Sequence, residues 1–90
     1  MLKVRYSSKF KKDFKTIIKR GYDVSLFQKV LVLLCEEKTL PEKYNDHALK
    51  GDYSGHRECH ITPDWLLIYK KENDMITLSL TRTGTHSDLF

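Results

Sequence analysis

The four histidines of this sequence all lie in its C-terminal half, and three of them lie at the end of a predicted strand or in the segments that flank the strands. His47 lies in a long polar loop, His60 ends a predicted strand and His86 stands in the C-terminal tail. Asp64 opens the strand after His60, and Arg82 ends the last predicted strand. Because histidine exchanges protons near neutral pH, a sheet that gathers these ends would assemble an acid–base set.

Such a set suits cleavage of a phosphodiester without a metal. One group takes a proton from the attacking hydroxyl, and another gives a proton to the leaving oxygen. A cation stabilises the charge that builds on phosphorus. In RNA the nucleophile can be the neighbouring 2′-hydroxyl, so no covalent enzyme intermediate is needed.

Each of these residues also has a structural explanation. His60 fits as an ordinary strand residue, Asp64 as a turn residue and Arg82 as one partner of a surface ion pair. His56 fits as an exposed residue between a turn and a strand. Zinc ligation by the other three histidines and Asp64 is a third possibility. It is less favoured, because no pair has the spacing of a recurring zinc motif.

The N-terminal part predicts a strand over Leu2–Tyr6 and then two helices. Ser7 or Ser8 caps the first helix, whose apolar residues recur at helical spacing and whose lysines lie off that stripe. The stripe consists of Phe10, Phe14, Ile17 and Ile18, and the lysines are Lys9, Lys11, Lys12, Lys15 and Lys19. Gly21 suits the C-terminal end of this helix, and Asp23 caps a second, largely apolar helix that runs to about Lys38. The short link predicts an antiparallel helical hairpin.

The rest of the chain predicts a loop and a meander of strands. Turn residues mark Thr39–Tyr53 as a loop, and short turns join three strands. These strands span Gly55–Ile61, Trp65–Lys71 and Met75–Arg82. The tail from Thr83 is too short for an element of its own. The order β-α-α-β-β-β predicts a two-layer α+β domain over residues 1–90, with a mostly antiparallel sheet and the helical hairpin on one face.

Composition and charge narrow the classes of protein. The 90 residues contain no apolar run long enough to span a membrane, and the N-terminus lacks a signal-like apolar stretch. Cys35 and Cys59 form no metal motif, which predicts two buried thiols in a reducing cytoplasm. Residues 1–20 hold eight Lys or Arg against one Asp, whereas the remainder is net acidic. The basic segment predicts either a nucleic-acid partner or simply a solvated helix face.

Four ordered strings in the C-terminal half resemble a known family. They are Asp46-His47-Ala48-Leu49-Lys50-Gly51, Arg57-Glu58-Cys59-His60, Pro63-Asp64-Trp65-Leu66-Leu67-Ile68-Tyr69, and Arg82-Thr83-Gly84-Thr85-His86-Ser87-Asp88-Leu89-Phe90. They resemble YafQ toxins of the RelE/ParE superfamily of bacterial type II toxin–antitoxin systems. Residues 1–45 are similar to the family in pattern and length rather than in identity.

The resemblance implies a microbial-ribonuclease-like fold and a ribosome-dependent endoribonuclease without a cofactor. Such toxins cut the mRNA codon in the ribosomal A site by attack of the 2′-hydroxyl, which inhibits translation. The family's functional positions correspond here to His47, His60, Asp64, Trp65, Arg82, His86 and Phe90.

Roles follow from this resemblance as hypotheses. His86, in a flexible tail, is the candidate general acid, and His60 or His47 is the candidate base. Asp64 would orient or share the base, and Arg82 would stabilise the charged phosphorane. The aromatic rings of Trp65 and Phe90 would stack on a base. The basic helix, through Lys9, Lys12 and Lys15, would meet ribosomal RNA phosphates.

The resemblance also implies a protein partner, a cognate antitoxin of the DinJ or RelB kind. DNA would be bound only through the complex with that antitoxin. Two further functions remain open. One is a toxin of the same fold that inhibits its target by binding alone, as the ParE toxins act on DNA gyrase. The other is an RNA-binding module that depends on the lysines and not on the histidines.

Overall fold

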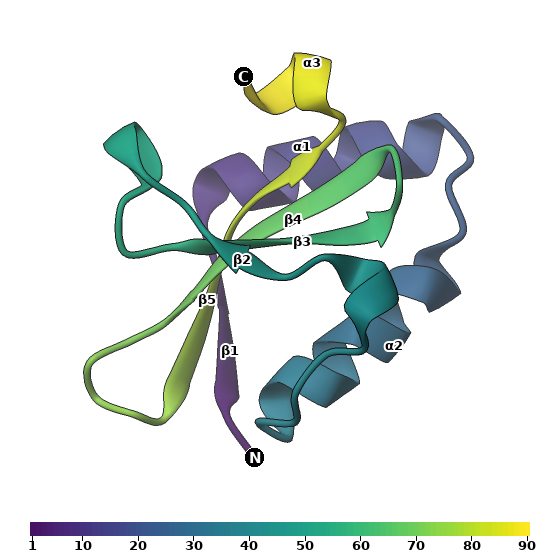
Figure 1. The fold of residues 1–90 in the computed structure, drawn as a ribbon. Coiled ribbons are helices and arrows are strands. Elements are labelled where there is room, and N and C mark those ends of the chain that lie inside the picture. Colours follow the sequence, from purple (N-terminus) through teal and green to yellow (C-terminus); the bar gives the residue numbers. More distant parts are fainter.

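The computed structural model describes residues 1–90 and begins with a strand and two capped helices (Figure 1). Strand β1 covers Lys3–Tyr6, helix α1 covers Ser8–Lys19 and helix α2 covers Val24–Cys35. The Ser7 side chain accepts a hydrogen bond from the amide of Phe10, and the Asp23 side chain accepts one from the amide of Ser25. Both predicted caps are therefore confirmed. Gly21, at φ 80°, turns the chain between the helices.

A five-stranded sheet forms the other layer. Its remaining strands are β2 (His47–Ala48), β3 (Arg57–Thr62), β4 (Trp65–Lys71) and β5 (Thr77–Gly84), and the order across the sheet is β1-β5-β4-β3-β2. Strand β1 pairs in parallel with β5, and every other pairing is antiparallel. The predicted α+β class and the mostly antiparallel sheet are confirmed.

The helices cover one face of this sheet. Helix α1 packs against β5 and α2 against β3, with Phe10, Ile17, Phe27 and Val30 among the buried residues that the helices contribute. Alternate residues of the strands meet them, including Cys59, Trp65, Leu67, Leu78 and Leu80. In Figure 1, α1 runs to the right above the sheet and α2 returns to the left. Cys35 and Cys59 are both buried and free, as predicted.

The opposite face of the sheet has only a small apolar cluster. Leu66 and Ile68 of β4 are fully buried there against Leu89, with Leu49 and Tyr53 at the margin. Leu89 belongs to a short C-terminal helix, α3, over His86–Leu89. Most of this face is therefore left to polar side chains, and we call it the open face.

The structure corrects several element boundaries. The tail forms α3, whereas no element was predicted there, and the predicted loop contains β2 and the 3₁₀ turns Glu42–Tyr44 and Gly51–Tyr53. Helix α2 ends at Cys35, because Glu37 adopts a left-handed φ of 58°. Strand β5 begins at Thr77, since the Asp74 side chain accepts from the amides of Ile76 and Thr77.

One residue of the predicted apolar stripe of α1 is not buried. Ile18, at the edge of that stripe, is 54% exposed. No helix of the structure is both long enough and apolar enough to cross a membrane.

Candidate functional site

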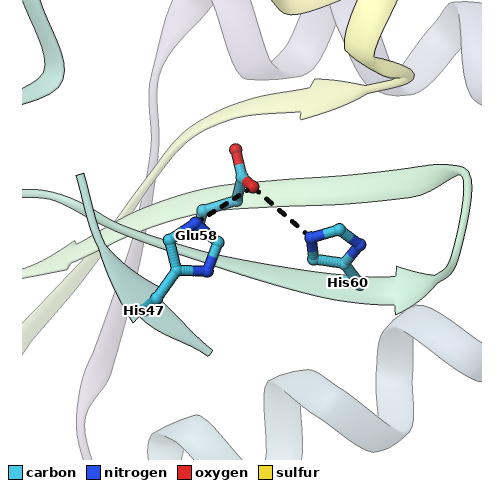
Figure 2. A group of neighbouring side chains, drawn as sticks. All are labelled: His47, Glu58 and His60. Carbon is cyan, nitrogen blue, oxygen red and sulfur yellow. Dashed lines mark ion pairs between the residues drawn. The ribbon is translucent and has the colours of Figure 1, made fainter. Parts of the chain in front are cut away.

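A buried carboxylate between two histidines is the centre of the open face. Glu58 and His60 are two residues apart on β3 and so project from the same face, and His47 of β2 pairs directly with Glu58. Glu58 Oε1 lies 3.4 Å from His47 Nε2 and 3.5 Å from His60 Nε2, as Figure 2 shows. Only 3% of Glu58 is exposed. A protonated imidazole on either side would stabilise its charge.

The loop before β2 fixes the orientation of His47. The Nδ1 atom of His47 lies 2.8 Å from the carbonyl oxygen of Asn45, so the Nε2 atom of the same ring faces Glu58. Asp46 accepts hydrogen bonds from Arg57 and from the hydroxyl of Tyr69. Burial, and then the Asp46 carboxylate, raise the pKa of Tyr69 well above its ordinary value, so the phenol remains a donor. This network holds the short strand β2 against β3.

Helix α3 is held in place, contrary to the expectation of a flexible tail. Thr85 and Asp88 form a capping box, and Leu89 is buried. Arg20, which directly follows α1, donates two hydrogen bonds to Asp88, and these bonds hold the pKa of the Asp88 carboxyl far below its usual range. Gly84 is required for this approach, because a Cβ there would lie 2.9 Å from Asp88 Cβ.

The capped helix brings His86 beside His60. The His86 ring lies 6.0 Å from that of His60, which lies 6.2 Å from the ring of His47. On its other side, His86 lies 5.9 Å from Phe90, whose ring is 63% exposed. Three of the predicted site histidines thus form one row, with an exposed aromatic ring beside its end.

Arg82 is held on the same face, two strands away from Glu58. In the sheet register Glu58 pairs with Ile68, and Ile68 pairs with Arg82. The Arg82 guanidinium donates to both carboxylate oxygens of Asp13, at 2.7 and 3.0 Å. Asp13, and less strongly Tyr53, raise the pKa of Arg82, which stays cationic at every physiological pH.

Two predicted residues do not join this group. Trp65 is fully buried on the helix-covered face, where its Nε1 donates to Thr83 Oγ1 at 2.8 Å and its ring meets Tyr22 edge-on. The prediction that Trp65 stacks on a base is therefore wrong for this conformation, and its role is in the core. Asp64 is exposed in the β3–β4 turn, and its side chain makes no hydrogen bond or ion pair with the other predicted site residues.

The three lysines of α1 are all exposed but differ in their surroundings. Lys9 lines a pocket of about 500 Å³ together with Tyr53 and Phe90. Lys12 and Lys15 are exposed and do not line this pocket. Of the three lysines, only Lys9 lies beside Phe90 in this way.

Sequence reasoning missed Glu58 and Tyr53. The prediction considered strand ends, whereas Glu58 lies inside a strand, where glutamate is uncommon. Its spacing of two residues from His60 was the available signal. The ligand atoms of His47, Glu58 and His60 lie within 4.8 Å of one another, so these residues could also hold a transition metal through two nitrogens and an oxygen.

Known proteins resemble this chain over its whole length. Residues 2–90 match the family model described as a bacterial toxin of type II toxin–antitoxin systems, YafQ. The mRNA interferase toxin YafQ of Escherichia coli K12 is 40% identical over 88 residues, which cover 97% of this chain and 94% of that protein.

Solved structures agree with this match. A metal-bound toxin from Helicobacter pylori superposes with a TM-score of 0.93 at 47% identity, with both chains covered completely. YafQ in the Escherichia coli DinJ–YafQ complex superposes with a TM-score of 0.89 at 38% identity, covering 100% of this chain and 99% of that chain. The predicted resemblance is confirmed, and the chain belongs to the YafQ family of bacterial type II toxin–antitoxin toxins.

Proposed function

We propose that this toxin is an endoribonuclease that enters the ribosomal A site and cuts the mRNA there. The observation that carries the proposal is the row of His47, Glu58, His60 and His86 on the open face, with Arg82 fixed beside it. The mRNA interferase name of the Escherichia coli relative supports the choice of substrate. Inhibition of translation in the cytoplasm follows from this activity.

The arrangement supports a complete proton balance. Glu58, alone or through His60, takes the proton of the 2′-hydroxyl, and the resulting oxygen attacks the adjacent phosphorus. His86, on the exposed side of the row, gives a proton to the leaving 5′ oxygen. The products are a 2′,3′-cyclic phosphate and a 5′-hydroxyl. His60 and Glu58 share the base function in this scheme, because His60 Nε2 lies only 3.5 Å from Glu58 Oε1 and a proton can pass between them.

Arg82 stabilises the phosphorane that forms between these two proton transfers. Its Nε and one terminal nitrogen are occupied by Asp13, which fixes the plane of the guanidinium before the substrate arrives. A cation held in advance needs little reorganisation as charge develops on phosphorus. Phe90 is placed to stack on an exposed base next to the scissile bond.

The test is cleavage on programmed 70S ribosomes, with mRNA 5′ ends mapped by primer extension. The wild-type protein should cut within the A-site codon, and His86→Gln should lower the cleavage rate by about 10²–10⁴-fold. Naked mRNA serves as the control for ribosome dependence. If neither protein cuts while both bind ribosomes, the protein inhibits by binding alone, which is the alternative function.

Metal independence belongs to the same proposal, because the described groups can complete both proton transfers themselves. A metal on His47, Glu58 and His60 would occupy the very atoms that the proton transfers use. If naked RNA is cut, EDTA should leave that rate unchanged and Zn²⁺ should lower it. A rate that EDTA abolishes and Zn²⁺ restores would instead establish a metal-dependent reaction.

The proposal includes an antitoxin partner similar to DinJ, which a solved complex joins to YafQ. Helix α2 offers it an apolar surface, since Val32 is 50% exposed and lines a pocket of about 580 Å³ with Leu33 and Tyr44. An acidic segment that folds on binding would suit this basic protein. DNA contact would come only through that partner. Val32→Asp should weaken co-purification with the antitoxin, whereas Thr39→Asp, which adds the same charge at an exposed position outside this pocket, should not.

A further inference from the structure

A second polar pocket lies on the open face, next to the histidine row but lined by other residues. It has a volume of about 470 Å³ and lies at the junction of β1, β4, β5 and the start of α1. Arg5, Lys70, Ser79 and His56 line it. None of these residues belongs to the set that performs the proposed cleavage.

The sheet register fixes the position of this pocket relative to the site. Ser79 pairs with Arg5 on one side and with Lys70 on the other, which makes one row across three strands. The next set of residues paired across the strands on the same face consists of Glu58, Ile68 and Arg82. Lys70 and Ile68 are two residues apart on β4, so the rows are separated by about 7 Å along the strand. Adjacent phosphates of an extended RNA strand have a spacing of this order.

The pocket has the chemistry of a phosphate site. The side chain of Arg5 makes no ion pair or hydrogen bond, and Val4 beside it packs on the core, so the Arg5 side chain projects to the open face. Helix α1 begins at the pocket with Ser8 and has no acidic residue in its first turn. Its N-terminus therefore adds a positive dipole end to the two cationic side chains.

Two further groups show that the hydrogen-bonding capacity of the pocket is only partly used within the protein. The Nδ1 atom of His56 is buried and has no hydrogen-bond partner in the protein. Glu72, the one carboxylate of the lining, accepts from Ser79 at 2.6 Å and lies 3.9 Å from Lys70. An incoming phosphate would find Arg5 free and would replace Glu72 as the partner of Ser79 and Lys70.

Aromatic rings connect this pocket to the histidine row. Tyr53 meets His56 edge-on at 6.0 Å and Phe90 edge-on at 6.1 Å. Phe90 in turn neighbours His86, so a strand of RNA that crosses the open face would meet rings along its path. Stacking on such rings is tolerant of sequence.

From this geometry we infer that the pocket of Arg5, Lys70, Ser79 and His56 binds a backbone phosphate of the substrate RNA, next to the scissile phosphate. The inference rests on the proposed function. In this inference, Arg5 and Lys70 position the RNA strand. The bound phosphate belongs to the mRNA rather than to ribosomal RNA, because the pocket adjoins the histidine row that would perform the cleavage.

The experiment measures binding rather than cleavage. The probe is a short single-stranded 2′-O-methyl RNA, which 2′-hydroxyl attack cannot cut, and its affinity is measured by fluorescence anisotropy at several salt concentrations. Arg5→Gln should weaken binding about tenfold and reduce the salt slope by about 0.7. Glu72→Gln should strengthen binding. Lys3→Gln, two residues away on β1 and outside the pocket, is the matched loss of one charge.

A neutral methylphosphonate placed beside the central linkage locates the contact. The methylphosphonate is placed on either side of the central linkage in turn. At one of these two positions it should weaken binding of the RNA to the wild type and to Lys3→Gln. It should not weaken binding to Arg5→Gln, which has already lost the contact with that phosphate. The inference is overturned if Arg5→Gln and Lys3→Gln lose the same affinity for the RNA and the methylphosphonate affects both variants alike. It is also overturned if the wild-type protein does not bind the RNA probe. A loss of Arg5→Gln affinity for mRNA-free ribosomes equal to its loss for the probe would assign the phosphate to ribosomal RNA and would also overturn it.

These results are separable from the proposed function. If His86→Gln still cuts mRNA while the methylphosphonate coupling to Arg5 is present, the cleavage mechanism fails and the pocket stands. If His86→Gln abolishes A-site cutting and Arg5→Gln binds normally, the cleavage mechanism stands and the pocket inference fails.

Discussion

The two faces of the sheet use alternate residues of the same strands for opposite purposes. On the covered face, Cys59, Leu67 and Leu80 meet the helices and are fully buried. On the open face, Glu58, His60 and Arg82 are held by polar partners and stay near solvent, except for the glutamate. The covered face supplies the apolar packing that stabilises the fold, and the open face carries the charged and titratable side chains.

Glu58 shows the difference most clearly. A carboxylate that is 3% exposed should be unfavourable unless its partners stabilise its charge, and its two histidine partners lie at 3.4 and 3.5 Å. Stability alone does not require such an arrangement, since buried ion pairs are often replaceable by apolar residues. The comparison therefore predicts that changes on the open face affect activity and changes on the covered face affect folding.

The largest effect is expected from Glu58→Gln. This change keeps the shape of the side chain and removes the charge that both histidines face, so the cleavage rate on ribosomes should fall by about 10²–10⁴-fold. The free energy of unfolding in urea should not fall. Glu36→Gln removes a carboxylate from the surface, where its only partner is Lys38, and is the matched control. A Glu58→Gln protein that is less stable yet fully active would make Glu58 a structural residue.

Trp65 tests the other side of the comparison. Trp65→Ala should reduce the free energy of unfolding by about 3–5 kcal/mol, because it leaves a cavity in the core and removes the hydrogen bond to Thr83. Trp65→Phe should fall between the alanine variant and the wild type. Urea denaturation measures both. If Trp65→Phe instead keeps its stability and loses affinity for RNA, the tryptophan contacts the substrate in another conformation.

Trp65 and Glu58 also show how far the sequence predicts this molecule. Helical spacing and strand alternation predicted the layers, because they report which side chains avoid water. The family motif included Trp65 but did not say which face of the sheet the ring would occupy. Strand registers and the row of histidines depend on pairing between distant segments, such as His47 with Glu58, and local patterns do not carry that information.

Helix α3 was missed for a related reason. A four-residue helix has little intrinsic stability. It forms here because Arg20, far away in sequence, binds Asp88, and because Leu89 finds a buried position on the open face. The same contacts place His86 beside His60, so the position of His86 near another histidine was predicted, whereas the contacts that hold it there were not.

Phe90 should produce a smaller effect than Glu58 or Trp65. Its ring is mostly exposed, so Phe90→Ala should leave the free energy of unfolding unchanged. Loss of one stacking contact should weaken RNA binding by about 1–3 kcal/mol. Anisotropy with the 2′-O-methyl strand measures this, and Phe90→Tyr, which keeps an aromatic ring, should retain the affinity. Equal losses in the alanine and tyrosine variants would indicate packing against α3 rather than stacking.

The smallest effect concerns the ion pair that joins the two regions. Because Arg20 lowers the pKa of Asp88 below its unfolded value, the pair stabilises the folded state at pH values above the ordinary aspartate pKa of about 4. This stabilisation is lost as the pH falls through the folded-state pKa. Arg20→Gln should therefore lower the melting temperature slightly and by a constant amount at neutral pH, and the difference from the wild type should shrink below about pH 4.

The same variant sharpens the comparison between the faces. Arg20 caps the C-terminal end of α1 in the helical layer, yet its partner Asp88 supports the helix that carries His86. Arg20→Gln should therefore lower the cleavage rate at neutral pH more than its small change in melting temperature would suggest. Arg20→Lys, which keeps the charge but loses the second hydrogen bond, should fall between the two proteins. If the rate is unchanged in Arg20→Gln, the capping box and Leu89 alone hold His86 in place, and the two faces are independent at this point.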